Sequence, residues 1–292
     1  MRDANGSWAI IVHGGARTMP PRDHQKNRRG CLRAVELGAA LLAAGGGALD
    51  AVETAVRQLE DDPTFNAGYG AAANALGEIE LDASIMDGST LAIGAVGAVR
   101  GLAHPISVAR LLLDETPGLL VGEGARRFAG CVGAEPSGPP AAKLQFETAC
   151  DTVGCVALDS GGRMAVGLST GGLDGKMPGR VGDTPLPGCG FYVDDEAGGV
   201  ALSGDGDNIA RTLLAARVMT ELRNSSAQAA AEKALTCLSR VGGEAGAIVL
   251  DRNGRFGCAH NSEHFAVALA SSTLRPRAAI DQDELREIMT HG

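Results

Sequence analysis

The stretch Asp151-Thr152-Val153-Gly154 lies halfway along the 292-residue chain and separates two segments of different character. The residues before it, from Cys131 to Cys150, lack hydrophobic periodicity and include Glu135-Pro136-Ser137-Gly138-Pro139-Pro140, a composition typical of a linker. The residues after it, Val153 to Leu158, form an alternating apolar run that predicts a β-strand. Thr152 is therefore expected where a linker enters a strand.

This position makes Thr152 a candidate nucleophile. A threonine hydroxyl is a weak nucleophile unless a base lies next to it. If the peptide bond between Asp151 and Thr152 were cut, the new α-amino group, with a reference pKa of about 7.7 to 8.0, would supply that base. The alternative interpretation is structural, because threonine is common at the start of a strand. The tetrad alone favours the structural interpretation.

A second pair of hydroxyls follows in Ser169-Thr170-Gly171-Gly172. The runs Val153 to Leu158 and Met164 to Ser169, joined by a turn, predict a β-hairpin. One hydroxyl at the end of the second strand is therefore expected beside Thr152, although Ser/Thr-Gly-Gly also ends many strands without any function.

Charged and hydroxyl groups continue downstream. In Pro178-Gly179-Arg180-Val181-Gly182-Asp183, the guanidinium of Arg180 suits a carboxylate and the carboxylate of Asp183 suits an ammonium group. Taken alone, this motif favours a structural salt bridge between the two residues. Ser203 and Gly204 place a hydroxyl and a backbone N–H in tandem, as an oxyanion hole requires.

Three other polar segments have weaker functional interpretations. Asp205-Gly206-Asp207-Asn208 lacks the spaced acids and the glutamate of a calcium loop, and Gly45-Gly46-Gly47 lacks the Lys-Ser/Thr of a phosphate loop. His13 is expected to be a structural residue with satisfied hydrogen bonds. The six histidines show no spacing typical of zinc ligands, so no metal is expected in catalysis.

The overall composition narrows the classes of partner and compartment. A net charge of −9 argues against nucleic-acid or anionic-membrane binding and leaves small molecules or peptides as partners. Seven cysteines without a Cys-x-x-Cys pair suit reduced thiols, and the N-terminus lacks the apolar core of a signal peptide. The longest low-charge stretch is too short to span a bilayer. We expect a soluble, cytoplasmic protein.

Helices in the first part of the chain and hairpins in the second, with one linker between them, predict a layered α/β architecture in one domain rather than a βαβ parallel sheet. Glycines at 42 positions indicate many tight turns and close approaches between elements. A strand from Trp8 to Val12 is expected to end in a turn at His13-Gly14-Gly15-Ala16, and the charged segment from Arg275 is expected to be peripheral. The other predicted elements are helices over 32–42, 49–59, 106–113 and 209–222, strands over 80–86 and 92–99, and a hairpin over 247–260.

Six motifs in order resemble the plant-type asparaginase and isoaspartyl peptidase family of N-terminal nucleophile hydrolases. The resemblance extends from about Trp8 to Leu269. The motifs are His13-Gly14-Gly15-Ala16, Phe65-Asn66-Ala67-Gly68-Tyr69-Gly70, Glu80-Leu81-Asp82-Ala83-Ser84-Ile85-Met86-Asp87-Gly88, Asp151-Thr152-Val153-Gly154, Ser169-Thr170-Gly171-Gly172 and Pro178-Gly179-Arg180-Val181-Gly182-Asp183.

The resemblance implies an α+β fold, a four-layer αββα sandwich, made as an inactive precursor. Cleavage between Asp151 and Thr152 would give an α subunit of residues 1–151 and a β subunit of residues 152–292, and the family suggests a dimer of such αβ heterodimers. Thr152 would then hydrolyse L-asparagine to aspartate and ammonia and cleave β-aspartyl (isoaspartyl) dipeptides.

The resemblance also assigns roles to individual residues. Thr170 would tune the nucleophile, Arg180 would bind the substrate α-carboxylate, and Asp183 would bind its α-ammonium group. Ser203 and the Gly204 N–H would stabilise the oxyanion.

Asn66 would help to position the nucleophile. The loop from Leu59 to Tyr69 resembles the family's sodium loop, in which backbone carbonyls hold a structural Na⁺. The carbonyl ligands implied are those of Leu59, Glu60, Asp62, Phe65, Ala67 and Tyr69.

The chain departs from the family at three positions. Threonine is usual where Ser203 stands and glutamate is common where Asp207 stands, so the Ser203 hydroxyl has a less restricted rotamer. Asp205 is expected on the leaving-group side.

Two alternative functions stay open. One is a glycosylasparaginase-type hydrolase, disfavoured by the absence of a signal peptide and of a disulfide pattern. The other is a metabolite-binding member of the fold that never processes.

Overall fold

The computed structural model describes residues 6–116, 118–138 and 152–290. Asp151 and Cys150 lie outside this range, as does most of the expected linker. Where that linker begins, Pro136 forms a β-bridge with Leu102. Among the described residues, none of the helices combines the length and apolar character needed to cross a bilayer.

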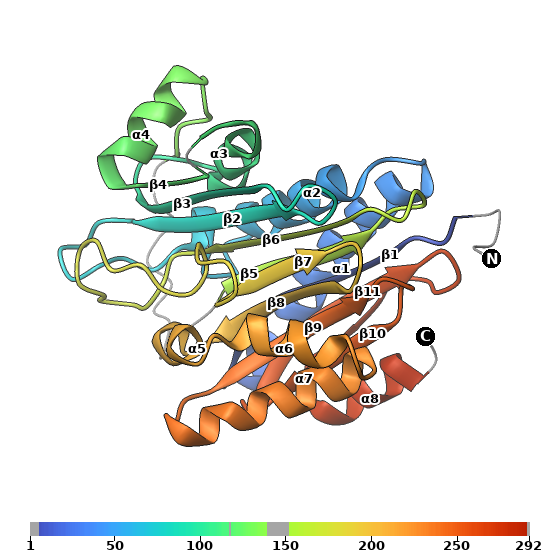
Figure 1. Cartoon of the computed structure of the whole chain (residues 1–292). Coiled ribbons are helices and arrows are strands. Elements are labelled where there is room, and N and C mark those ends of the chain that lie inside the picture. Colours follow the sequence, from blue (N-terminus) through green and yellow to red (C-terminus); the bar gives the residue numbers. More distant parts are fainter. Residues whose placement is uncertain (1–5, 117, 139–151, 291–292) are drawn as a thin grey trace.

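Two β-sheets pack face to face between layers of helices (Figure 1). The strands of the larger sheet are β1 (Ala9–Arg17), β2 (Leu81–Asp87), β3 (Ile93–Val99), β4 (Leu119–Val121), β5 (Thr152–Leu158), β6 (Met164–Thr170), β11 (His264–Ser271) and β12 (Arg277–Ala279). The smaller sheet holds β7 (Phe191–Asp194), β8 (Gly198–Gly204), β9 (Ala245–Asp251) and β10 (Phe256–His260). The strand orders are β12-β11-β1-β5-β6-β2-β3-β4 and β10-β9-β8-β7.

Helices form the two outer layers, which confirms the four-layer αββα sandwich (Figure 1). The helices are α1 (Pro21–Ala43), α2 (Ala48–Asp61), α3 (Pro105–Leu111), α4 (Gly122–Cys131), α5 (Gly206–Thr212), α6 (Leu214–Leu222), α7 (Ala227–Leu235) and α8 (Gln282–Thr290). Short 3-10 turns lie at Gly68–Gly70, Leu112–Asp114 and Thr236–Arg240. The large sheet packs against α1, α2 and α3, and the small sheet packs against α6 and α7.

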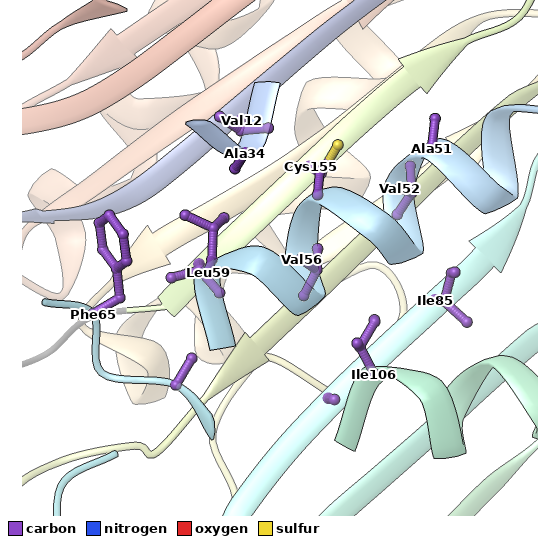
Figure 2. Close-up of a cluster of buried hydrophobic side chains, with 14 of the residues drawn as sticks. Val12, Ala34, Ala51, Val52, Val56, Leu59, Phe65, Ile85, Ile106 and Cys155 are labelled. Atoms are coloured by element: carbon purple, nitrogen blue, oxygen red, sulfur yellow. The ribbon is translucent and has the colours of Figure 1, made fainter. Parts of the chain in front are cut away.

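Three apolar clusters fill the spaces between the layers. The first joins α1, α2 and α3 to the large sheet, where Val56 and Leu59 of α2 lie near Ile106 and Cys155 (Figure 2). The second lies between the sheets and the third between the small sheet and α6 and α7. In β1, Val12 belongs to the first cluster and Ile11 to the second, because side chains alternate between the faces of a strand.

The predicted end of the first strand is wrong. Instead of turning at His13, β1 continues to Arg17 through a bulge, with the register against β11 shifting between His13 and Ala16. Gly15 has φ of +111°, a conformation that favours glycine, so the Gly14-Gly15 pair lets the strand bulge rather than turn.

Two other predictions about the second half are corrected. The helix over 209–222 is broken at Leu213, whose left-handed φ of +51° separates α5 from α6. The segment from Arg275 is not peripheral, because β12 pairs with β11 and α8 buries Leu285 and Ile288 against the core. Strands β4, β7, β8, β11 and β12 and helices α4, α7 and α8 were not predicted. The predicted helix over 32–42 is confirmed but begins eleven residues earlier, at Pro21. The remaining predicted helices, strands and hairpins are confirmed within a few residues at each end.

Candidate active site

Thr152 and Thr170 lie side by side at one end of the large sheet. Thr152 is the first residue of β5 and pairs directly with Thr170, the last residue of β6. Thr170 in turn pairs with Asp82 on β2. The predicted hairpin therefore places the second hydroxyl next to the candidate nucleophile, and both threonines are buried.

A small cleft, partly open to solvent, lies over this strand end. It brings together five of the predicted residues, Thr152, Thr170, Arg180, Asp183 and Gly204. Its full lining is Thr152, Thr170, Gly172, Leu173, Arg180, Gly182, Asp183, Thr184, Gly204 and Gly206.

Ser203 lies against the backbone of Thr152. Its Oγ accepts hydrogen bonds from the N–H of Thr152 at 3.2 Å and from the N–H of Ala16, in the β1 bulge, at 3.1 Å. A hydroxyl has one hydrogen and two acceptor sites, so both acceptor sites are filled and the hydrogen is left to donate elsewhere. Ser203 therefore joins the start of β5 to β1 and keeps a donor free.

The side chain of Thr152 contacts a residue that the sequence did not reveal as part of the site. Its Oγ1 lies 3.3 Å from Oγ1 of Thr184, and both side chains are buried. Thr184 directly follows Asp183, so its position next to a predicted site residue was the available signal.

Asn66 shapes the turn beneath the cleft. The side-chain amide of Asn66 donates to the Gly172 carbonyl at 2.6 Å, and the backbone carbonyl of Asn66 accepts from the Gly171 N–H at 2.8 Å. The Gly172 N–H donates to Oγ1 of Thr170 at 2.9 Å. Within the described residues Asn66 thus reaches Thr170 through the Gly171-Gly172 turn, and its side chain makes no hydrogen bond to Thr152.

Arg180 forms its ion pair with Asp207 rather than with Asp183. The Nη2–Oδ1 distance is 2.8 Å, and the Asp207 side chain is 60% exposed while that of Arg180 is 17% exposed. Oδ2 of the buried Asp183 has no hydrogen-bond partner among the described residues. The interpretation of Arg180 and Asp183 as a structural salt bridge is therefore wrong, and both groups face the cleft.

The ionisation of Asp183 is strongly perturbed. Burial raises the pKa of Asp183 to about 7, and the negative charges of Asp82 and Asp207 act in the same direction. The guanidinium of Arg180 opposes this shift. A cationic group bound next to Asp183 would stabilise its ionised form and lower its pKa, because an opposite charge favours the charged carboxylate.

Two buried charges behind the cleft were missed by sequence reasoning. Oδ1 of Asp82 accepts from the Ala98 N–H at 2.7 Å, and Lys176 donates to the Glu80 carbonyl at 2.9 Å. Burial raises the pKa of Asp82, while the charges of Lys176 and Arg180 lower it. Lone charges give no periodic signal, so only the fold shows that the charges of Asp82 and Lys176 influence each other.

His13 differs from the expectation of a satisfied structural histidine. Its ring is buried, lies 5.5 Å from the ring of Phe265, and has no hydrogen-bond partner of good geometry on either nitrogen among the described residues. Burial lowers the pKa of His13 to about 3, moderated by the nearby backbone of Thr152. The neutral ring therefore packs beneath the nucleophile.

Asp205 caps the start of α5. Its Oδ2 accepts from the Asn208 side-chain amide at 2.7 Å, and its other oxygen faces the Asn208 N–H at 3.5 Å. Asp205 is not part of the cleft lining. The carboxylate is thus committed to the helix start rather than directed into the cleft.

Several backbone carbonyls of the predicted sodium loop lie close to Gly68 and Gly70. A Cβ at Gly70 would meet the carbonyl oxygens of both Phe65 and Pro63, and one at Gly68 would meet the carbonyl oxygen of Glu60. The carbonyls of Asp62 and Ala67 each accept one turn hydrogen bond, which leaves a second lone pair on each oxygen. The loop thus offers several carbonyl oxygens of the kind that a hard cation binds.

Comparison with known proteins gives consistent matches along nearly the whole chain. The model of a protein family described as "Asparaginase" matches residues 6–142 and 135–280. The isoaspartyl peptidase/L-asparaginase of Bos taurus is 41% identical over 270 residues, covering 85% of this chain and 88% of that protein. The proteins of the same name from Macaca fascicularis and Homo sapiens are 39% and 38% identical, each covering 94% of both chains.

Proposed function

Because this chain belongs to the asparaginase family, we propose that it is a self-processing hydrolase that acts on L-asparagine and on β-aspartyl dipeptides. The observation that carries the proposal is the cleft whose lining holds Thr152 together with Arg180 and the buried Asp183. An α-amino acid presents one carboxylate and one ammonium group, which Arg180 and Asp183 complement.

Self-cleavage comes first. The Oγ1 of Thr152 attacks the carbonyl carbon of Asp151, the carbon–oxygen bond forms, the carbon–nitrogen bond breaks, and the hydroxyl proton passes to the nitrogen. Water then hydrolyses the ester. This leaves residues 1–151 and 152–292 as two subunits of one folded domain, with the free α-amino group of Thr152 at the cleft.

Hydrolysis uses the group that cleavage creates. The α-amino group of Thr152 accepts the Oγ1 proton as Oγ1 attacks the side-chain carbonyl of the substrate. The Ser203 hydroxyl and the Gly204 N–H donate to the oxyanion, which is supported by the Ser203 hydrogen left free by its two accepted bonds. Ammonia or the dipeptide's amine departs with a proton, and water releases aspartate from the acyl-enzyme.

Denaturing mass spectrometry together with an assay of aspartate release tests this function. We expect two fragments that meet at the Asp151–Thr152 bond, and aspartate from both L-asparagine and a β-aspartyl dipeptide. A chain that stays at full length after prolonged incubation and hydrolyses neither substrate would contradict the proposal. Aspartate release from an N-glycosyl-asparagine alone would instead identify a glycosylasparaginase.

Substrate binding should weaken in acid because Asp183 must be ionised to hold an ammonium group. The pKa of Asp183 is raised to about 7 in the free protein, so the carboxylate is lost as the pH falls through that value. We expect the Kd of L-aspartate to rise about tenfold per pH unit below this pKa. Calorimetry on the cleaved enzyme between pH 5 and 8 measures the Kd of L-aspartate at each pH. A constant Kd over that range would rule out this role of Asp183.

Replacing Ser203 with alanine should lower kcat more than it changes KM. The change removes an oxyanion donor, for which losses of about 10²- to 10³-fold in kcat are typical. It also removes the acceptor of two N–H groups, so slower maturation is expected. Steady-state kinetics on the fully cleaved fraction measure the first effect. Unchanged kcat would exclude Ser203 from the oxyanion hole.

Three further properties complete the proposal. A structural Na⁺ is held by carbonyls of the Leu59–Tyr69 loop, supported by the carbonyl oxygens of Glu60, Pro63 and Phe65 that lie close to Gly68 and Gly70. The active form is a dimer of αβ heterodimers, as the family resemblance implies. The protein is cytoplasmic, supported by the free thiols of the cysteines that the structure describes.

A further inference from the structure

Thr184 is positioned by the fold to meet the nucleophile. Its side chain is 1% exposed, and its Oγ1 lies 3.3 Å from Oγ1 of Thr152. Its backbone is held by a second contact, because the hydroxyl of Ser84 on β2 donates to the Thr184 carbonyl at 2.7 Å. The contact therefore joins two anchored segments, the start of β5 and a loop tied to β2.

The uncut chain needs such a contact because the usual base is absent. Before cleavage the nitrogen of Thr152 is an amide, and its N–H already donates to Ser203. An amide nitrogen does not accept the hydroxyl proton as a free amine does. The orientation of the Thr152 hydroxyl must then come from neighbouring side chains, and Thr184 makes a hydrogen bond to that oxygen in the described structure.

We propose that Thr184 is a positioning residue that holds the Thr152 hydroxyl in the rotamer used for attack. The proposal rests on the function proposed above and adds to it. A second hydroxyl is not basic enough to remove the proton, so Thr184 acts by fixing the direction of Oγ1 and not by acid–base catalysis. Its hydrogen bond selects one of the staggered χ1 positions that Thr152 would otherwise share.

The same contact serves both reactions. During self-cleavage it directs Oγ1 toward the preceding carbonyl carbon, and the proton moves to the departing nitrogen. During hydrolysis it directs Oγ1 toward the bound substrate, and the proton moves to the α-amino group. Substrate recognition does not depend on the Thr184 hydroxyl, because Arg180 and Asp183 supply it.

The test compares Thr184→Val, which keeps the shape but removes the hydroxyl, with Thr184→Ser, which keeps the hydroxyl. The matched control is Thr212→Val, since the buried Thr212 hydroxyl bonds only to the carbonyls of Asn208 and Ile209 among the described residues. Self-cleavage rates come from denaturing mass spectrometry. Values of kcat and KM for L-asparagine come from the fully cleaved fraction of each variant.

We expect Thr184→Val to slow self-cleavage and lower kcat about tenfold each, the loss expected for one hydrogen bond, with KM nearly unchanged. Thr184→Ser should recover both rates to within about threefold of the unaltered protein. The control Thr212→Val should have the same two rates as the unaltered protein. If the valine variant does not fold, Thr184→Ala gives the same comparison.

Unaltered rates in Thr184→Val or Thr184→Ala would overturn the proposal. So would a serine variant as slow as the valine variant, because packing and not the hydroxyl would then matter. A rise in KM with constant kcat would equally contradict a role in orienting the nucleophile. Failure of the proposed function looks different, since the unaltered protein itself would then stay uncut and release no aspartate.

Discussion

Replacing Thr152 with alanine should give a folded chain of full length that neither cleaves itself nor hydrolyses L-asparagine. Both reactions begin with attack by the same Oγ1, so its removal abolishes both together. The fold should persist, because the change removes one methyl and one hydroxyl at a strand end while the β5 pairings with β1 and β6 depend on the backbone. Mass spectrometry and circular dichroism measure the two parts of this expectation.

The control for this variant is Thr152→Ser, which keeps a hydroxyl at the same position. It should still mature, more slowly, because serine lacks the β-branch that restricts the rotamer of threonine. An alanine variant that is cut at the same bond would show that another group performs self-cleavage. An alanine variant that stays uncut but hydrolyses asparagine would show that Thr152 is not the nucleophile of substrate hydrolysis.

Replacing Arg180 with methionine should lower kcat/KM for L-asparagine by a large factor, mainly through KM. Removing one member of a buried hydrogen-bonded charge pair typically costs about 2 to 5 kcal/mol of binding, or roughly 30- to several thousand-fold. Self-cleavage should continue at nearly the normal rate, because the Asp151 residue within the chain has no free α-carboxylate to recognise. Steady-state kinetics and mass spectrometry measure the two rates.

The same variant should change the behaviour of Asp183. Arg180 lowers the pKa of that carboxyl, so its removal moves the acid limb of aspartate binding to higher pH. The matched control is Arg211→Met, since Arg211 donates to the partly buried Asn208 side chain at 2.8 Å and does not line the cleft. If 3-aminopropanamide, which lacks the α-carboxylate, loses as much activity as asparagine, Arg180 does not bind that carboxylate.

The layers and the central hairpin were predictable from the sequence because they follow from regular patterns. The alternating runs on either side of Asp159-Ser160-Gly161-Gly162 indicated the hairpin that pairs Thr152 with Thr170. Periodic apolar positions indicated α1 and α2 on one face of the sheet. Local sequence was sufficient in these places since neighbouring segments of the chain form the contacts.

Features that depend on distant segments were not predictable in the same way. Thr184 meets Thr152 only when the loop after β6 folds back, and Ser203 meets the N–H of Ala16 across 187 positions. The left-handed residue at Leu213 breaks a continuous apolar stripe, because the packing of α5 and α6 overrides the local helical pattern. Two glycines were interpreted as a turn although they form a bulge.

The strand order of the large sheet has a consequence for the cut protein. Strand β1 belongs to the fragment that ends at residue 151. It nevertheless lies between β11 and β5, which both belong to the fragment that begins at Thr152. Strand β6 likewise pairs with β2 across the same divide. The two fragments are therefore interleaved within one sheet, so they cannot separate on dilution without breaking its hydrogen bonds. Cutting the chain frees a new terminus but leaves each fragment dependent on the other for its fold.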